Sequence, residues 1–148
     1  MKKYIYLALG ALALSSVMPA WQADQKSTAR TLKVKLNYTG SGTVDEKHKI
    51  IVFLFDTPDF AQGGVMPMAM EAGTSKDAVV TFADTAKSPV YAVCVYDPSG
   101  GYEGQSEPPS GSSLGMYSTT PGKADPIKIE AGQKVEVELK FDDTAKMP

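Results

Sequence analysis

The chain has 148 residues, of which 43% are apolar and 22% charged, with 15 Lys and Arg against 17 Asp and Glu. A chain of this length is expected to form one domain with a substantial hydrophobic core. Its balanced charge argues against binding to nucleic acid or to an anionic membrane surface, because either kind of binding needs a basic face on the protein. A single His and a single Cys exclude mechanisms that need two imidazoles, a Cys pair or a cluster of His ligands.

The N-terminal segment has the pattern of a cleavable signal peptide. Lys2 and Lys3 precede an uncharged stretch over residues 5–14, which is too short for a transmembrane helix of about 20 residues. A small residue for cleavage stands at Ala23 (PAWQA) and at Ala20 (VMPA), and Ala23 is the preferred site. The alternative is an N-terminal helix of the core.

Cleavage after Ala23 divides the chain into a signal peptide over 1–23 and a single domain over 24–148. The protein is therefore expected to be periplasmic or secreted, without membrane insertion after cleavage. No Cys stands directly after the apolar stretch, so a bacterial lipid anchor is not indicated.

The remaining sequence predicts strands. Seven are expected in chain order, over residues 31–38, 49–55, 65–71, 78–82, 90–96, 127–130 and 133–141. The first and last alternate between apolar and polar residues, which is typical of half-buried strands. The runs 49–55 and 90–96 are continuously apolar and fit central strands that are covered on both faces. Since Gly-rich and Ser-rich turns separate these segments, we expect an all-β, seven-stranded antiparallel β-sandwich with one long loop.

Four segments of this sequence also carry a resemblance to a known family. They are LKVKLNYTGSG, KIIVFLFDTPDF, the run VYAVCVYDPSGG into an acidic loop, and the closing AGQKVEVELKF. Together, over about residues 31–141, they resemble the carboxypeptidase regulatory-like, or transthyretin-like, β-sandwich domain of exported bacterial proteins. The resemblance implies a sandwich used for stability, docking or ligand contact rather than catalysis.

The enzymes that share this architecture need residues that the chain lacks. Transthyretin-like hydrolases of the urate pathway use several His and Arg residues, whereas this chain has only His48 and Arg30. A sandwich dioxygenase needs two His ligands for iron. A Ser-His-Asp triad could be built only through His48, which has no nucleophile motif nearby and is expected to be solvated. We therefore expect no enzymatic activity and no cofactor.

Cys94 lies within the apolar run 90–96, where a thiol behaves as a small hydrophobic side chain. We expect it to be buried and inert. The alternative is an intermolecular disulfide or a reactive thiol, because exported proteins meet an oxidising compartment.

Met66, Met68 and Met70 stand at alternate positions, so an extended chain would place their three thioethers on one face. Soft Cu(I) or Ag(I) favours such ligands, and a periplasmic soft-metal-binding protein is the alternative function. The simpler interpretation is that the three side chains fill space in the core.

Asp97, Glu103 and Glu107 offer hard oxygen ligands on a flexible loop and suggest calcium. Their spacing is poor, because a calcium loop needs oxygen side chains at alternate positions, where Ser99 and Gly101 stand. An ordinary acidic loop is the expected interpretation.

The loop over residues 98–126 is long for a compact domain and rich in Pro, Gly and Ser. It is the candidate contact surface for a protein or another surface ligand of unknown identity. The candidate binding residues are Tyr102, Glu103, Glu107, Leu114, Met116 and Tyr117. The alternatives are a structural loop, folded back on the sandwich in tight turns, and a disordered loop.

Overall fold

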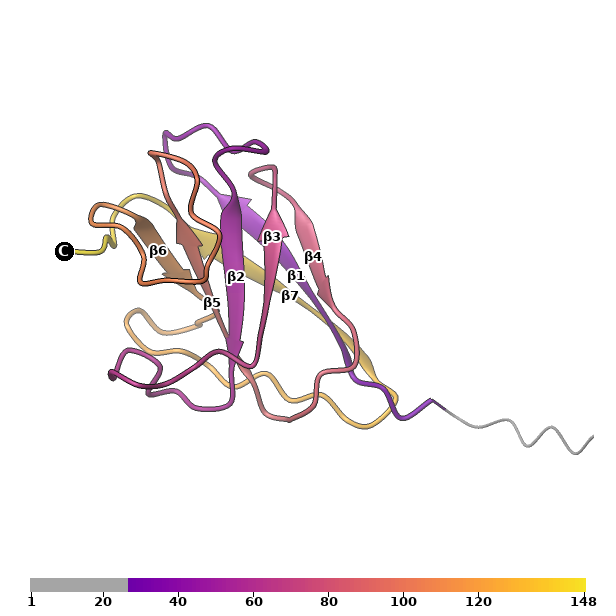
Figure 1. Ribbon diagram of the computed structural model, residues 1–148. Helices are drawn as coiled ribbons and strands as arrows, with labels where there is room; N and C mark the ends of the chain where they lie inside the picture. The colour runs from indigo at the N-terminus through magenta and orange to yellow at the C-terminus, as the bar shows by residue number, and fades with distance from the viewer. Residues whose placement is uncertain (1–26) are drawn as a thin grey trace, which may run out of the picture.

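The computed structural model describes residues 27–148, so the expected signal peptide lies outside the described residues. The described part contains seven strands and no helix. The strands are β1 (Thr31–Tyr38), β2 (Ile50–Phe55), β3 (Ala69–Gly73), β4 (Val79–Phe82), β5 (Tyr91–Tyr96), β6 (Ser113–Met116) and β7 (Lys134–Phe141). They form a three-stranded sheet in the order β4-β1-β7 and a four-stranded sheet in the order β3-β2-β5-β6 (Figure 1). The expected all-β class with two sheets is confirmed.

The pairing of the first and last strands corrects the expectation of a fully antiparallel sandwich. β1 and β7 run parallel, in a register that places Thr31 opposite Lys134 and Tyr38 opposite Phe141. Alternation of apolar and polar residues is the same for parallel and antiparallel pairs, so the sequence pattern contains no information on strand direction.

The expected strands differ from the structure at three places. The strand expected over 65–71 is β3, which begins four residues later and ends two residues later. Residues 127–130, expected as a strand, form only an isolated bridge between Ile127 and Val90. In their place the structure has β6, which lies inside the segment expected to be a loop. Ile127 and Ile129 are buried at alternate positions, as in a strand, but the segment does not form the ladder of backbone hydrogen bonds that a strand needs. The expected number of seven strands is therefore correct only because the absent strand at 127–130 and the unexpected β6 offset each other.

One hydrophobic core lies between the two sheets. It contains the inward residues of β1 and alternate residues of β2 and β5, and Leu32, Leu36, Val52 and Leu54 have no solvent exposure. Val135 and Val137 of β7 pack against this core but are only half-buried, whereas Leu139 is fully buried. The residues of β7 that were expected to point into the core are thus fully buried only toward the C-terminal end of the strand.

Cys94 is fully buried within this core, as the sequence predicted. Burial raises the pKa of its thiol well above the ordinary value, so the reactive thiolate is disfavoured. We expect the native protein to leave Cys94 unmodified by a thiol reagent, and the unfolded protein in urea to be modified completely. A reagent that releases a chromophore on reaction with a thiol allows the extent of Cys94 modification to be measured by absorbance. Rapid modification of the native protein would show that β5 opens to solvent.

Candidate functional site

The two sheets differ sharply on the faces that point away from the core. Strand register and alternation place only apolar side chains outward on the four-stranded sheet. They are Met70, Ala72, Ile51, Phe53, Phe55, Tyr91, Val93, Val95, Leu114 and Met116. The corresponding face of the three-stranded sheet is mainly charged, with exposed Lys33, Lys35, Glu136 and Glu138. An apolar outer face must be covered by other parts of the chain or by a partner.

The chain supplies part of this cover from the segment 97–109. Tyr102 is only 8% exposed and packs against Ile51, Phe53, Phe55 and their neighbours in a second hydrophobic cluster. Its hydroxyl donates a hydrogen bond of 2.9 Å to the carbonyl oxygen of Ser106. Burial raises the pKa of Tyr102, so the ring stays neutral.

Gly104 allows this segment to lie directly on the sheet. Its φ is +82°, and a Cβ added there would lie 3.0 Å from Ile51 Cγ2 and 3.0 Å from Met70 Sδ. Glycine suits this position for two reasons, because it adopts a positive φ without strain and has no side chain to contact Ile51 and Met70. Tyr102, a candidate binding residue, is therefore buried in this structure, and its ring helps to close the apolar face.

The remainder of the outer face stays partly open. Phe60, from the segment after β2, stacks on Phe55 with 5.3 Å between ring centroids. Five half-buried apolar side chains pack against the second hydrophobic cluster, and we call them the apolar rim: Phe60, Val65, Tyr91, Leu114 and Met116. Leu114 and Met116 were expected binding residues. The sequence pattern did not single out Phe60, Val65 or Tyr91 as binding residues. For Tyr91 a signal existed, because it lies at alternate positions with Val93 and Val95 and so shares their face of the strand.

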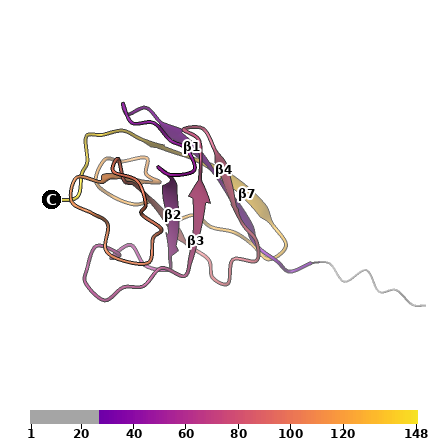
Figure 2. The ribbon, with the colours of Figure 1, turned by 45° about the horizontal axis from the view of Figure 1, so that its top comes forward.

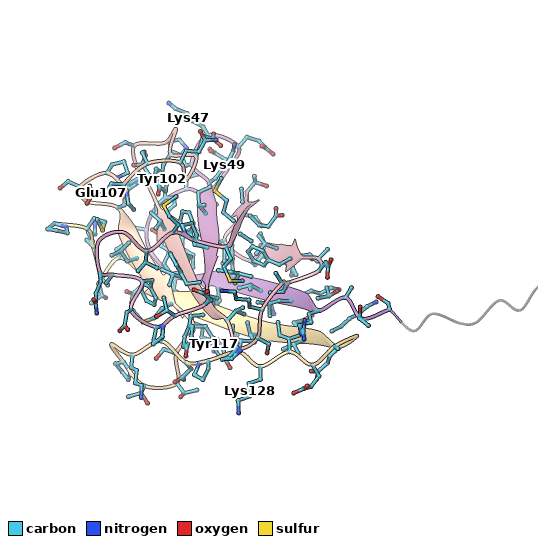
Figure 3. All side chains as sticks on the ribbon, turned by 60° about the horizontal axis from the view of Figure 1, so that its bottom comes forward. Lys47, Lys49, Tyr102, Glu107, Tyr117 and Lys128 are labelled. Carbon is cyan, nitrogen blue, oxygen red and sulfur yellow. The ribbon has the colours of Figure 1, made fainter. Side chains whose placement is uncertain are left out.

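The other expected binding residues do not join the apolar rim. Tyr117 packs against the core between the sheets, and its N–H donates to the carbonyl of Ala92 at 2.9 Å. Figure 3 shows Tyr117 and Lys128 well separated from Tyr102 and Glu107. The segment 98–126 is therefore not one contact surface, because β6 divides it into two parts.

Glu103 and Glu107 are both exposed to solvent. Glu103 forms an ion pair with Lys49, at 3.0 Å between Oε1 and Nζ. Asp97 and Glu103 line a shallow hollow of about 480 Å³ in the segment 97–109, and Glu107 does not. Across residues 27–148 no group of three or more His, Cys, Asp or Glu side chains is arranged to hold a metal ion. The acidic residues suggested for calcium are thus not gathered around one point.

The three methionines also lie in different surroundings. Met66 is 79% exposed, and Met70 is 41% exposed on the outer face. Met68 packs against the core between the sheets, and its N–H donates to the carbonyl of Leu54. Because β3 begins only at Ala69, strand alternation does not extend to Met66 and Met68. The row of three thioethers that the soft-metal alternative requires is absent, and the expected core packing holds for Met68 alone.

His48 is held by an acidic neighbour. Its Nδ1 lies 2.8 Å from Asp45 Oδ1, and the same oxygen accepts the backbone N–H groups of Lys47 and His48. These hydrogen bonds, those from His48 first, lower the pKa of Asp45. Within the described part of the chain, no Ser, Thr or Cys side chain hydrogen-bonds to the imidazole. The Asp45–His48 pair closes the turn before β2.

Asp143 forms a polar network that the sequence analysis missed. Its Oδ1 accepts hydrogen bonds from the hydroxyls of Tyr38 at 2.5 Å and Ser113 at 2.8 Å. Its Oδ2 accepts from the backbone N–H and the hydroxyl of Ser41. These bonds hold the pKa of Asp143 well below its usual range, while burial and the Asp143 contact raise the pKa of Tyr38 to about 12. The network ties β1, the following turn, β6 and the C-terminal segment together.

Comparison of the chain with protein-family models, with curated proteins and with solved structures finds no match. Among residues 27–148, no helix is long and apolar enough to span a membrane. The surfaces described above are therefore the basis for a functional proposal.

Proposed function

We propose that the chain is an exported, non-catalytic β-sandwich that serves as an accessory or binding module in the periplasm or outside the cell. It contacts a partner protein through the apolar rim. The observation that carries this proposal is the wholly apolar outer face of the four-stranded sheet, together with the half-buried rim side chains that belong to this face or pack against it. The resemblance to carboxypeptidase regulatory-like and transthyretin-like domains supports a docking role over a catalytic one.

The composition of the rim favours a protein partner. Phe60 and Tyr91 are aromatic, Met116 is flexible and polarisable, and such residues are enriched at the centres of protein interfaces. Each square ångström of apolar surface that a partner covers contributes about 25 cal/mol before the costs of association. Tyr91, Leu114 and Met116 of the rim are held in strands β5 and β6, so little ordering of these three residues is needed on binding.

A photoreactive amino acid placed at Met116 tests the proposal in the exporting cell. We expect a cross-linked adduct with one protein, recovered outside the cytoplasm, in which the chain begins near Asp24. The same amino acid at Thr81, exposed on the opposite sheet, is the matched control and should give no adduct.

Equal adducts from both positions, or none from position 116, would reject the rim as the contact surface. Recovery of the uncut chain from the membrane would reject export by a cleaved signal peptide. Circular dichroism of each variant should show the β spectrum of the wild-type protein, so that loss of an adduct reports on contact rather than folding.

A further inference from the structure

β7 has an open edge. It lies at the outside of the three-stranded sheet and pairs with β1 alone (Figure 2). With eight residues it equals β1 as the longest strand. Within the described residues, no other strand pairs with its outer side. Unpaired strand edges present N–H and C=O groups that can bind another extended chain.

The hydrogen bonds to β1 show which groups point outward. The N–H of Thr31 donates to the carbonyl of Gln133, and the N–H of Thr39 donates to that of Phe141. In a parallel ladder, alternate residues direct both backbone groups to the same neighbour. The odd-numbered residues of β7 therefore face β1. The even-numbered residues direct N–H and C=O to the open edge, and all four are exposed: Lys134, Glu136, Glu138 and Lys140.

The edge of β6 is closed, in contrast to that of β7. The N–H of Leu114 donates to the carbonyl of Ala145 at 2.8 Å, and Met147 exchanges hydrogen bonds with Gly111 and Ser112. The C-terminal segment thus occupies the edge of the four-stranded sheet. Within residues 27–148 nothing equivalent lies along β7, whose side chains Val135 and Val137 stay half-buried at the core.

The charges on β7 indicate what kind of strand fits. Two copies paired antiparallel in full overlap would place Lys134 opposite Lys140 and Glu136 opposite Glu138. Like charges directly opposite each other destabilise a strand pair. β1 shows the favourable arrangement, with Lys33 opposite Glu136 and Lys35 opposite Glu138. A strand of another protein with the opposite charge at each of these positions, in the order acid, base, base, acid, would match this edge.

We propose that the open edge of β7 accepts an extended segment of another protein as an added strand. The segment carries acidic, basic, basic and acidic residues at alternate positions, opposite Lys134, Glu136, Glu138 and Lys140. The apolar residues between them point inward and cover Val135 and Val137. This edge is separate from the apolar rim, which lies on the other sheet.

Titration of the isotope-labelled protein with the synthetic peptide EVKVKVE tests the proposal by NMR. We expect shift changes concentrated in the amides of residues 134–140. The peptide KVEVEVK, in which each charge has the opposite sign, should bind about tenfold more weakly, because it places like charges opposite each other.

Two variants at one position separate edge pairing from charge. Glu136→Pro removes an outward N–H without removing a bond to β1, and proline is tolerated at such edge positions. We expect it to weaken peptide binding about tenfold or more, whereas Glu136→Ala keeps the N–H and should bind within about threefold of wild type. If Glu136→Pro fails to fold, Glu138→Pro provides the same test.

Equal binding of the peptide to wild type and the proline variant would overturn the proposal. Shift changes centred on β6, no binding at about 1 mM peptide, or β7-mediated dimers would also overturn it. None of these outcomes affects cross-linking at Met116, so this proposal and the rim proposal can fail independently.

Discussion

An Asp143→Asn variant of the mature chain should lose about 2 to 4 kcal/mol of unfolding free energy at pH 7. Hydrogen bonds to a charged group contribute about 1.5 to 3 kcal/mol, and the change leaves the partly buried Tyr38 hydroxyl without its carboxylate acceptor. Asp142 is the matched control, because its carboxylate is exposed and its hydrogen bonds come from Thr144 alone. Urea denaturation followed by circular dichroism should show little change for Asp142→Asn. Equal stability of the two variants would contradict the importance of the network.

The same carboxylate should make stability depend on pH at the acid end. Hydrogen bonds from Tyr38, Ser41 and Ser113 hold the pKa of Asp143 in the folded protein below its value in the unfolded chain. Its contribution is therefore complete above the unfolded pKa, near 3.8, and is lost as the pH falls through the lower folded value. As the pH falls over that range, the free energy of unfolding of Asp143→Asn should decrease less than that of wild type.

Tyr38 should produce a smaller effect at the alkaline end. Burial and the hydrogen bond to Asp143 raise its pKa from 10.0 to about 12. Its contribution is complete below the unfolded pKa of 10.0 and is lost as the pH rises through the folded value. Tyr38→Phe should remove this component and leave the acid-side dependence reduced but present, because Ser41 and Ser113 still bind Asp143.

The sequence predicts best where burial follows a local period. β1, β2, β4, β5 and β7 each agree with their expected ranges to within one residue at either end. Continuous apolar runs correctly indicated that β2 and β5 are covered on both faces. The runs do not reveal what forms the outer cover. Tyr102 was therefore assigned to a contact surface when its ring in fact completes the second hydrophobic cluster.

Other features depend on contacts between distant residues and have no local pattern. The hydrogen bond between Tyr38 and Asp143 joins residues 105 positions apart. β6 is short and contains Gly115, so neither length nor alternation distinguishes it from the surrounding turns. The open edge of β7 depends on which strand becomes its neighbour, and that follows from topology rather than from the composition of β7.

Gly115→Ala should destabilise the protein by about 3 kcal/mol, because β6 approaches the other sheet closely at this residue. A Cβ there would lie 2.5 Å from Phe141 Cβ and 2.7 Å from Cys94 Sγ, with no flexible side-chain end to move aside on Phe141. Adding a methyl group to a filled core typically costs about 1 to 3 kcal/mol, and a contact this short belongs at the upper end of that range.

Gly63→Ala is the matched control, since nothing lies within 4 Å of a Cβ at that position. Urea denaturation should show it to be as stable as wild type. If β6 moves away from Phe141 to admit the new methyl group, the cover over Cys94 opens as well. The native Gly115→Ala protein should then react with a thiol reagent faster than wild type. Wild-type stability together with an unreactive Cys94 would show that the two sheets can separate at this point without cost.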